Sequence, residues 1–422
     1  SGTPQVEIRD EYDAATRSYR LHMRQHTPPS AAQPQKTALP IPIRFGLRDA
    51  DGAPLEAHSA SPMLLRPDLI LLETEQAQIE FTGVDSRPRP GFLHGFSAPV
   101  KLDYAYSGEG LAQLLLLEED GFLRWEAAQR LMLEALFEQM RGAPGEHRAR
   151  LLDSLQKLAA QAPEDKALLA ELLRLPAENE LAAQIDQMDP QRVASARDAL
   201  REAIAVALTG PLSVWATWAP TELSVENTGR RSLSNLALWY LAALDSARIR
   251  RLALERATSP NMSLAMGALR ALRDHESVER EAAMDEFHAR FRNDPLVLDK
   301  WFALEASSAR PGGVERIEAL LNHPDFVPNP NRVRAVLGSF MRENLCAFHR
   351  IDGSGYRLFA EQIAQFDQTN AQLAARLVEG LLGFARLSAP YAQMMRATVE
   401  QLAATDVSRD VREKLDKALA AA

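Results

Sequence analysis

The chain has 422 residues, of which 46% are hydrophobic and 25% are charged, and 48 Lys and Arg stand against 57 Asp and Glu for a net charge of −9. This composition excludes a disordered chain and leaves room for two or three domains. The acidic balance argues against nonspecific binding to nucleic acid or to an anionic membrane, so we expect neither partner.

Residues 1–104 have the pattern of a small β domain. They contain 12 of the 25 prolines, and their apolar residues alternate with period two, which is typical of strands with one buried face. The stretch 27–37 is predicted to be an exposed loop and 49–52 a turn. Six or seven short strands with such turns favour an immunoglobulin-like β-sandwich. The clearest strands are expected near 19–23, 41–47, 69–73, 77–81 and 100–106.

Residues 105–422 have helical periodicity to the end of the chain. Helix starts are predicted where Asp, Ser or Asn precedes Pro, at 189–190, 259–260, 294–295 and 329–330, because the polar side chain caps free N–H groups and proline fits the first helical position. Many helices of 10–20 residues with short connections predict an all-α solenoid of antiparallel pairs, without a strict repeat period. The expected helices are 122–141, 146–160, 165–174, 190–208, 230–255, 261–273, 276–292, 295–307, 313–321, 330–343, 355–367, 370–386, 389–403 and 406–420.

The sequence also bears on the compartment. Cys346 is the single cysteine, which excludes an internal disulfide and fits a reducing, cytoplasmic location. The N-terminus has no signal-peptide pattern and no initiator Met, so we expect a processed chain or a piece of a longer one. The uncharged stretch 203–221 is interrupted by Gly210 and Pro211, which argues against a transmembrane helix.

Catalytic and metal-binding motifs are not apparent. His275-Glu276 begins like a zinc-binding HExxH helix, but Glu279 occupies the position of the second histidine. We therefore expect a solvated polar helix face there, unless distant ligands complete a site. Cys346 is interpreted as a small core residue rather than a nucleophile, and 352–355 as a turn and helix cap rather than a phosphate loop. No catalytic or metal-ligating residue is assigned.

Arginines near the start of the predicted helix at 330–343 need an explanation. Arg332 and Arg334 lie where a positive charge opposes the helix dipole. Either carboxylates elsewhere pair with them, or they point into a solvent-filled space and contact anionic or carbonyl-rich groups. A further arginine, Arg376, shares a helix face with Gln372, one turn earlier.

Several strings together resemble a known family. Spread over the whole chain, and in the family's order, they indicate similarity to the C-terminal half of bacterial alanyl aminopeptidase (aminopeptidase N), a family of zinc-dependent gluzincin peptidases. The matching strings are Phe96-Ser-Ala-Pro-Val-Lys-Leu102, Asp299-Lys-Trp-Phe302, Asn329-Pro-Asn-Arg-Val-Arg334 with Gly338 and Phe340, Ala347-Phe-His349, and Asp352-Gly-Ser-Gly-Tyr356.

The resemblance implies a four-part parent, of which this chain is similar to the last two parts, a β-sandwich and a helical solenoid. Residues 1–4 are similar to the family's sequence just after the catalytic domain. The family's HExxH and GAMEN motifs are absent here, so the resemblance implies a fragment that is inactive alone and holds no cofactor. The zinc belongs to the missing catalytic domain.

The resemblance also implies partners and site residues. The solenoid would cap the catalytic domain of the same parent polypeptide and form the chamber for peptides whose N-terminal residues the enzyme removes. Arg334, Gln372 and Arg376 match chamber-lining positions and would contact the downstream part of the peptide substrate or its carboxylate. The alternative is a stand-alone solenoid adaptor that binds a protein through its concave face.

Overall fold

A computed structural model describes the protein, and its residues form two compact units. Residues 1–135, 145–163 and 171–173 belong to the first unit, and the rest of the chain belongs to the second. The described residues are 2–30, 33–143 and 145–421.

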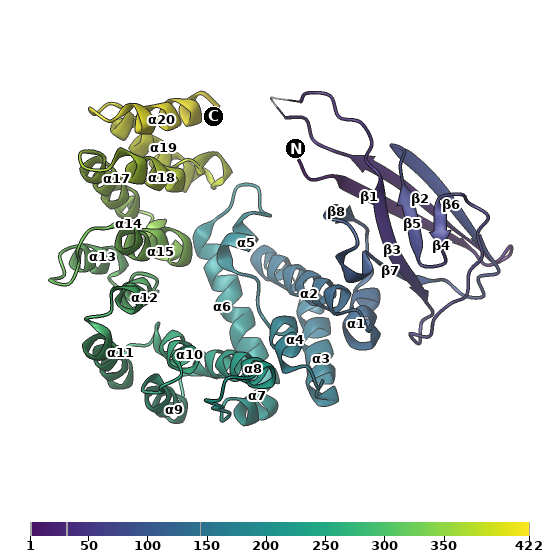
Figure 1. Ribbon diagram of the computed structural model, residues 1–422, viewed down its shortest axis with the longest axis horizontal. Helices are drawn as coiled ribbons and strands as arrows, with labels where there is room; N and C mark the ends of the chain where they lie inside the picture. Colours follow the sequence, from purple (N-terminus) through teal and green to yellow (C-terminus); the bar gives the residue numbers. More distant parts are fainter. Residues whose placement is uncertain (1, 31–32, 144, 422) are drawn as a thin grey trace. The chain divides into compact units, whose positions relative to one another are not determined.

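The first unit begins with two four-stranded sheets (Figure 1). One sheet has the order β6-β2-β1-β8 and the other β4-β5-β3-β7. Neighbouring strands are antiparallel except for β1 and β8, which are parallel. The strands are β1 Gln5–Asp13, β2 Ser18–His26, β3 Ile41–Arg48, β4 Leu64–Arg66, β5 Leu69–Leu72, β6 Gln76–Thr82, β7 Arg89–Phe92 and β8 Lys101–Asp103.

The sandwich core comes from the alternation in the sequence. On β2 and β3 every second side chain is buried, from Tyr19 to Met23 and from Ile41 to Leu47. Phe45 on one sheet and Phe81 on the other have ring centroids 5.7 Å apart, so side chains of both sheets fill one layer. The predicted immunoglobulin-like β-sandwich is confirmed.

Parts of the β prediction were wrong. Strands β1, β4 and β7 were not anticipated, although Val6 and Ile8 on β1 are fully buried. The predicted strand at 100–106 is paired only over Lys101–Asp103, because the backbone turns after it: the N–H of Tyr106 donates to the carbonyl of Tyr104 at 3.0 Å. The hydroxyls of these two tyrosines make contacts elsewhere. Tyr104 donates to Asp10 Oδ1 at 3.1 Å, and Tyr106 accepts from the N–H of Phe92 at 3.3 Å. Of the predicted loop 27–37, residues 31 and 32 lie outside the described residues.

The rest of the chain is helical, and from α8 to α20 the helices follow one another in an arc (Figure 1). The predicted all-α solenoid is confirmed. The helices are α1 Gly108–Leu117, α2 Gly121–Arg141, α3 Glu146–Gln161, α4 Lys166–Leu172, α5 Glu178–Ala182, α6 Pro190–Ala207, α7 Thr209–Trp215, α8 Val225–Ala242, α9 Ala247–Ala257, α10 Met262–Leu272, α11 Val278–Phe291, α12 Pro295–Ala306, α13 Gly313–Leu321, α14 Pro330–Val333, α15 Ser339–Glu343, α16 Leu345–Phe348, α17 Ser354–Asp367, α18 Ala371–Val378, α19 Ala389–Ala403 and α20 Arg409–Ala421, with a π-helical turn η2 Arg334–Gly338 and the 3₁₀ turns η1 His94–Phe96, η3 Glu379–Leu381 and η4 Phe384–Arg386.

Three of the four predicted helix caps are present. The carboxylates of Asp189 and Asp294 and the amide oxygen of Asn329 each accept hydrogen bonds from two N–H groups of the first turn, with proline at the next position. The fourth was wrong, because α10 is capped by Asn261 and not by Ser259. Asn261, which follows Pro260, is itself a capping residue, so the N-cap lies two positions after the predicted Ser259.

Two predicted helices are interrupted. The predicted helix 230–255 is two helices, since α8 ends at Ala242 and Asp245 adopts a left-handed conformation with φ 48° before α9 begins. The predicted helix 370–386 ends at Val378 and continues only as 3₁₀ turns. In both cases the apolar pattern of the sequence continues across the turn, so the pattern alone did not indicate where the helix ends.

The uncharged stretch 203–221 is interrupted, but at Leu208 and not at the predicted Gly210-Pro211, which lies in the first turn of α7. Helix α6 ends at Ala207 and α7 begins at Thr209, with Trp215 buried and Trp218 half-buried behind it. Among the described residues, none of the helices has the combined length and apolar content that a membrane crossing requires.

Buried His349 should make stability depend on pH. Its Nδ1 lies 2.7 Å from the hydroxyl of Tyr356, and burial lowers its pKa from 6.5 to about 4. Between these pH values the unfolded chain binds a proton that the folded chain excludes, so stability is full above pH 6.5 and is lost as the pH falls toward 4. The loss approaches about 3 kcal/mol.

Urea unfolding of the parent chain and of His349→Gln, at neutral pH and close to pH 4, measures this effect. His349→Gln should lose less stability on acidification than the parent chain. The control is His26→Gln, which changes an exposed histidine. An equal acid-induced loss in all three proteins would show that His349 does not cause it.

Candidate functional site

The three side chains predicted to line a chamber are exposed on the second unit. Arg334 begins the π-helical turn η2, and Gln372 and Arg376 lie one turn apart on α18. Within residues 2–30, 33–143 and 145–421, none of the three side chains makes a hydrogen bond or an ion pair. They are therefore available to a ligand or to another chain.

The π-helical turn places a second arginine beside Arg334. A Cβ at Gly338 would lie 3.2 Å from Arg334 Cγ and 2.7 Å from Arg342 Nη2, so both arginines flank this glycine on one helix face. Arg342 is exposed as well. Such π turns often occur at functional sites. The sequence analysis did not select Arg342, although its spacing of eight residues from Arg334 was a usable signal.

The segments that carry these side chains meet at one point. A Cβ at Gly380, in the turn that continues α18, would overlap with the sulfur of Met341 on α15. The structure shows no contact between Arg334 and either Gln372 or Arg376 among the described residues. The turn after α18 therefore packs against α15, but Arg334 does not bind Gln372 or Arg376 directly.

Arg332 has a structural role. It is 3% exposed, forms an ion pair with Asp299, and its guanidinium lies 4.5 Å from the ring centroid of Phe302. The ion-pair interpretation is therefore confirmed for Arg332 and does not apply to Arg334. Two residues along a helix turn the side chain by about 200°, so neighbouring arginines face opposite sides.

Folding brings together one cluster with metal-ligand chemistry. His288, His323 and Asp325 offer donor atoms within 4.8 Å of one another, a grouping that sequence spacing did not indicate. The donors already bind each other, because His288 Nε2 lies 2.9 Å from Asp325 Oδ2 and His323 Nδ1 accepts from the N–H of Asp325 at 3.1 Å.

The surroundings of this cluster are cationic. Burial, followed by the neighbouring His288, lowers the pKa of His323, and Arg332 and Arg292 act in the same direction. These features indicate a structural hydrogen-bonded group, and the cluster fits a zinc site poorly.

The residues around His275 are paired rather than solvated. His275 lies in the turn after α10, not on a helix face, and its Nδ1 is 3.2 Å from Asp245 Oδ1. Glu279, on α11, lies 3.4 Å from Arg250 Nε. The predicted solvated helix face was wrong, because an adjacent repeat supplies an acidic and a basic partner.

Neither Cys346 nor the turn at 352–355 has the features of a catalytic or phosphate-binding site. Burial raises the pKa of the Cys346 thiol to about 11, so it stays protonated at neutral pH. Asp352 Oδ1 accepts from the N–H of Ser354 at 2.9 Å, and α17 begins at that serine. The predicted turn is confirmed; Gly353 occupies the N-cap position without a side-chain cap, and Asp352, one residue earlier, accepts from the first helical N–H.

A charged cavity of about 370 Å³ lies in the second unit. We call it the inner pocket and define it by its lining side chains, which come from α5, α6, α8 and the segments after α10 and α15. They are Glu178, Ala194, Arg197, Asp198, Ala199, Arg201, Glu202, Trp239, Ala243, Arg273, Asp274, Ala309, Glu343, Asn344, Leu345 and Cys346.

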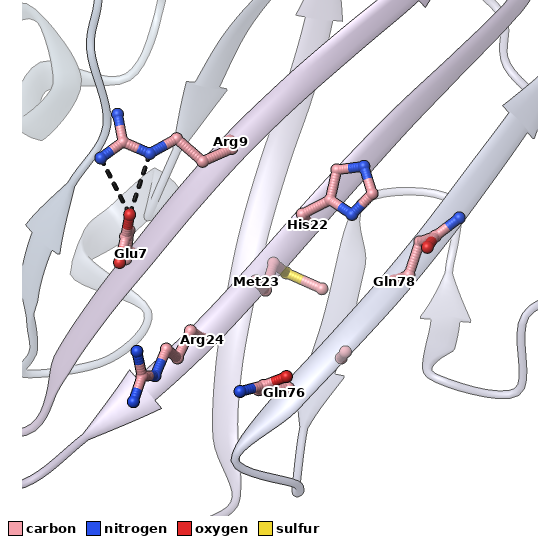
Figure 2. A pocket seen from close by; sticks show the side chains of 8 residues that line it. Glu7, Arg9, His22, Met23, Arg24, Gln76 and Gln78 are labelled. Carbon is pink, nitrogen blue, oxygen red and sulfur yellow. Dashed lines mark hydrogen bonds and ion pairs between the residues drawn. The ribbon is translucent and has the colours of Figure 1, made fainter.

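Another hollow, of about 480 Å³, lies on the sandwich (Figure 2). Side chains of β1, β2 and β6 line it, and Arg9 forms an ion pair with Glu7 at 2.8 Å on its rim. His22 and Gln78 complete a polar, largely exposed strand surface. This is the solvent face of one sheet rather than a cleft.

Comparison with known proteins gives consistent matches over both regions. The family model "Domain of unknown function (DUF3458_C) ARM repeats" matches residues 108–420, and "Domain of unknown function (DUF3458) Ig-like fold" matches residues 2–105.

Curated relatives cover the whole chain. Aminopeptidase N of Haemophilus influenzae is 35% identical over 431 aligned residues, which cover 99% of this chain and 49% of the relative. Aminopeptidase N of Escherichia coli is 34% identical over 100% of this chain and 49% of its own length. The crystal structure of Legionella pneumophila aminopeptidase A in complex with aspartic acid is 28% identical, with a TM-score of 0.85 over 100% of this chain and 49% of that one. The chain thus spans about half the length of the relatives it matches.

Proposed function

Because the chain belongs to the DUF3458_C family and is homologous over its whole length to the C-terminal half of aminopeptidase N, we propose that it is the non-catalytic part of a zinc-dependent aminopeptidase. The full-length match to half of each relative carries this proposal. The HExxH and GAMEN motifs are absent from the sequence. Zinc binding and hydrolysis of the N-terminal peptide bond would belong to the other half.

The proposed role of the solenoid is to cap the catalytic domain and to form a chamber for peptide substrates. Arg334, Gln372 and Arg376 support this role, because they are exposed and have no polar partner in the described part of the chain. Guanidinium groups bind carboxylates through paired, charge-assisted hydrogen bonds. These residues would therefore hold the downstream part of a peptide or its C-terminal carboxylate.

We also propose 1–104 and 105–422 as the two domains. The family models support a boundary there. The first compact unit nevertheless includes α1 and α3, because polar contacts cross the boundary: Arg48 pairs with Glu118 at 3.2 Å, and Arg130 donates to the carbonyl of Tyr104 at 3.1 Å. The cytoplasmic location suggested by the single cysteine remains a prediction.

Reconstitution with the N-terminal half of the same aminopeptidase tests the proposal. The chain alone should not hydrolyse an alanyl anilide, and mixing with the zinc-containing half should restore turnover. Metal-dependent turnover by this chain alone, surviving repurification, would contradict it. If the halves neither associate nor regain activity, the result favours the stand-alone adaptor, which the concave surface typical of ARM repeats supports.

Two substrates separate the chamber role from a structural one. Arg334→Ala combined with Arg376→Ala should lower kcat/KM about tenfold or more for a short peptide with a free carboxylate, the loss expected for a hydrogen bond between charged groups. The anilide has no carboxylate, so its turnover should change little. The matched control is Arg396→Ala, an exposed arginine on α19 that pairs with Glu400. An equal loss for both substrates would remove these arginines from the chamber.

A further inference from the structure

The inner pocket contains an unusual basic wall. Arg201 Nε donates to the carbonyl of Trp239 at 3.2 Å, and its guanidinium lies 4.2 Å from the Trp239 ring centroid. Arg197 lies 5.3 Å from the same ring and donates to the carbonyl of Pro176 at 2.8 Å. Within the described residues neither arginine forms an ion pair with a carboxylate. The indole thus positions two cations that interact with nearby carboxylates only at a distance, without forming an ion pair.

The same pocket contains four acidic groups without an ion pair. Glu178, Asp198, Glu202 and Glu343 make no hydrogen bond or ion pair with their side chains among the residues described, and Glu178 and Asp198 interact electrostatically with Arg197. Glu178 is half-buried and Asp198 is exposed to solvent. Burial raises the pKa of both carboxyls, while nearby arginines oppose the rise. A ligand with a positive charge would pair with these carboxylates.

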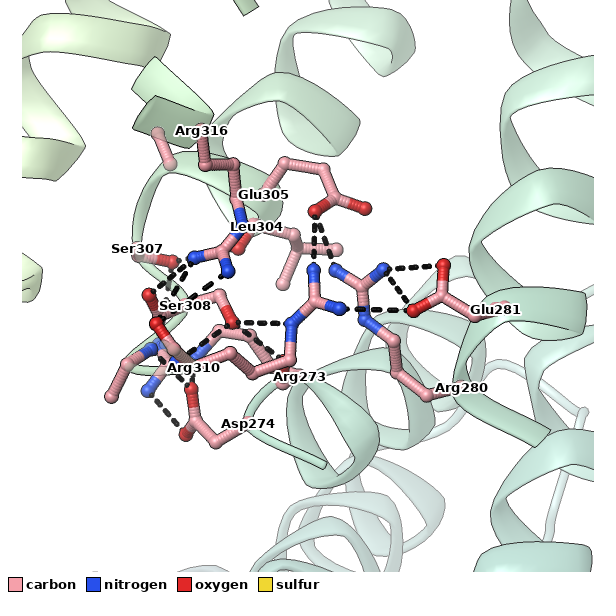
Figure 3. A network of polar contacts seen from close by, with 12 residues as sticks. Arg273, Asp274, Arg280, Glu281, Leu304, Glu305, Ser307, Ser308, Arg310 and Arg316 are labelled. Atoms are coloured by element: carbon pink, nitrogen blue, oxygen red, sulfur yellow. Dashed lines mark hydrogen bonds and ion pairs between the residues drawn. The ribbon is translucent and has the colours of Figure 1, made fainter. Parts of the chain in front are cut away.

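One charged pair of the wall is already satisfied. Arg273 pairs with Asp274 at 3.0 Å, and Asp274 accepts from the N–H of Ala309 at 2.9 Å (Figure 3). These contacts hold the turn after α10 against the chain after α12. The pocket therefore combines a rigid wall with two arginines, Arg197 and Arg201, and four carboxylates that form no ion pair among the described residues.

We propose that the inner pocket binds a small zwitterion of the α-amino acid or dipeptide class. Arg197 and Arg201 would bind its carboxylate, and Glu178 and Asp198 its ammonium group. The volume of about 370 Å³ lies at the lower end of the range for small-molecule sites. The choice of amino acids and dipeptides among zwitterions rests on the proposed aminopeptidase function. The site is separate from Arg334, Gln372 and Arg376, none of which lines it.

The single cysteine provides a specific reporter, because Cys346 lines this pocket. We would measure its slow modification by a large excess of maleimide at neutral pH, where most of the thiol is protonated and unreactive, and titrate the compounds named below by calorimetry. L-Leucine and leucyl-leucine should slow the reaction and bind. N-Acetyl-L-leucine and L-leucinamide, which each keep one charge, should bind at least about tenfold more weakly than L-leucine, since each lacks one charged contact. N-Acetyl-L-leucinamide, which has neither charge, should not bind and should not slow the reaction.

Variants connect the binding to the proposed contacts. Asp198→Asn and Glu178→Gln should each weaken leucine binding about tenfold, whereas Glu400→Gln, at an exposed ion pair on α19, should not change it. Circular dichroism verifies that each variant is folded. Absence of leucine and dipeptide binding, or equal protection by the neutral compound, overturns the proposal. Because these measurements use this chain alone, their failure is distinguishable from failed reconstitution of peptidase activity.

Discussion

Glu305→Ala should lower the free energy of unfolding by about 3–5 kcal/mol, because it leaves a buried arginine without its carboxylate. Arg280 is 2% exposed, and its guanidinium donates to Glu305 on the next helix, α12 (Figure 3). Arg310 donates to the same oxygen at 3.2 Å. Glu281 binds both arginines, but it is exposed and screened by solvent. Removing Glu305 therefore concentrates an uncompensated positive charge between two repeats.

Urea unfolding followed by circular dichroism measures this loss. The matched control is Glu400→Ala, which breaks an exposed pair at 3.0 Å and should cost no more than about 1 kcal/mol. The double variant Arg280→Met with Glu305→Leu should recover much of the stability, since apolar side chains replace a buried pair well. A single-variant loss no greater than that of the control would show that the network is not important for stability.

Gly355→Ala should be the second severely destabilising change, with a loss of about 3 kcal/mol. The glycine is the second residue of α17 and lies against the end of α16. A Cβ there would overlap with the carbonyl oxygen of Phe348 and lie 2.6 Å from that of Ala347. Both atoms belong to the backbone, so neither can move away as a flexible side chain would. The two helices would have to separate.

Gly383→Ala is the control for this prediction. Gly383 precedes the 3₁₀ turn η4 with φ −84°, which alanine also adopts, and apart from its chain neighbours nothing lies within 4 Å of a Cβ built on it. Alanine should therefore change the free energy of unfolding by no more than about 0.5 kcal/mol. A large loss at Gly355 with little change at Gly383 would show that close helix packing, rather than glycine itself, makes Gly355 necessary. Similar effects of the two changes would contradict this explanation.

The candidate site could be predicted only in part. The sequence showed that Arg332 and Arg334 needed either an ion pair or solvent. Which of the two arginines is paired depends on which side of the helix faces Asp299 and Phe302. The inner pocket was not visible at all. Its charged walls come from Glu178, Arg201 and Arg273, which lie far apart in the chain and meet only when the repeats stack.

The sequence by itself determined the elements whose cause is local. Alternation along β2 and β3 buries one face of each strand, and capping side chains such as Asp294 satisfy N–H groups two and three residues away. These interactions need no distant partner. The tertiary structure alone decided the division between α8 and α9, the pairing of His275 with Asp245, and the unpaired charges of the inner pocket. Each depends on which repeat packs against which, and that information is carried by contacts between residues distant along the chain.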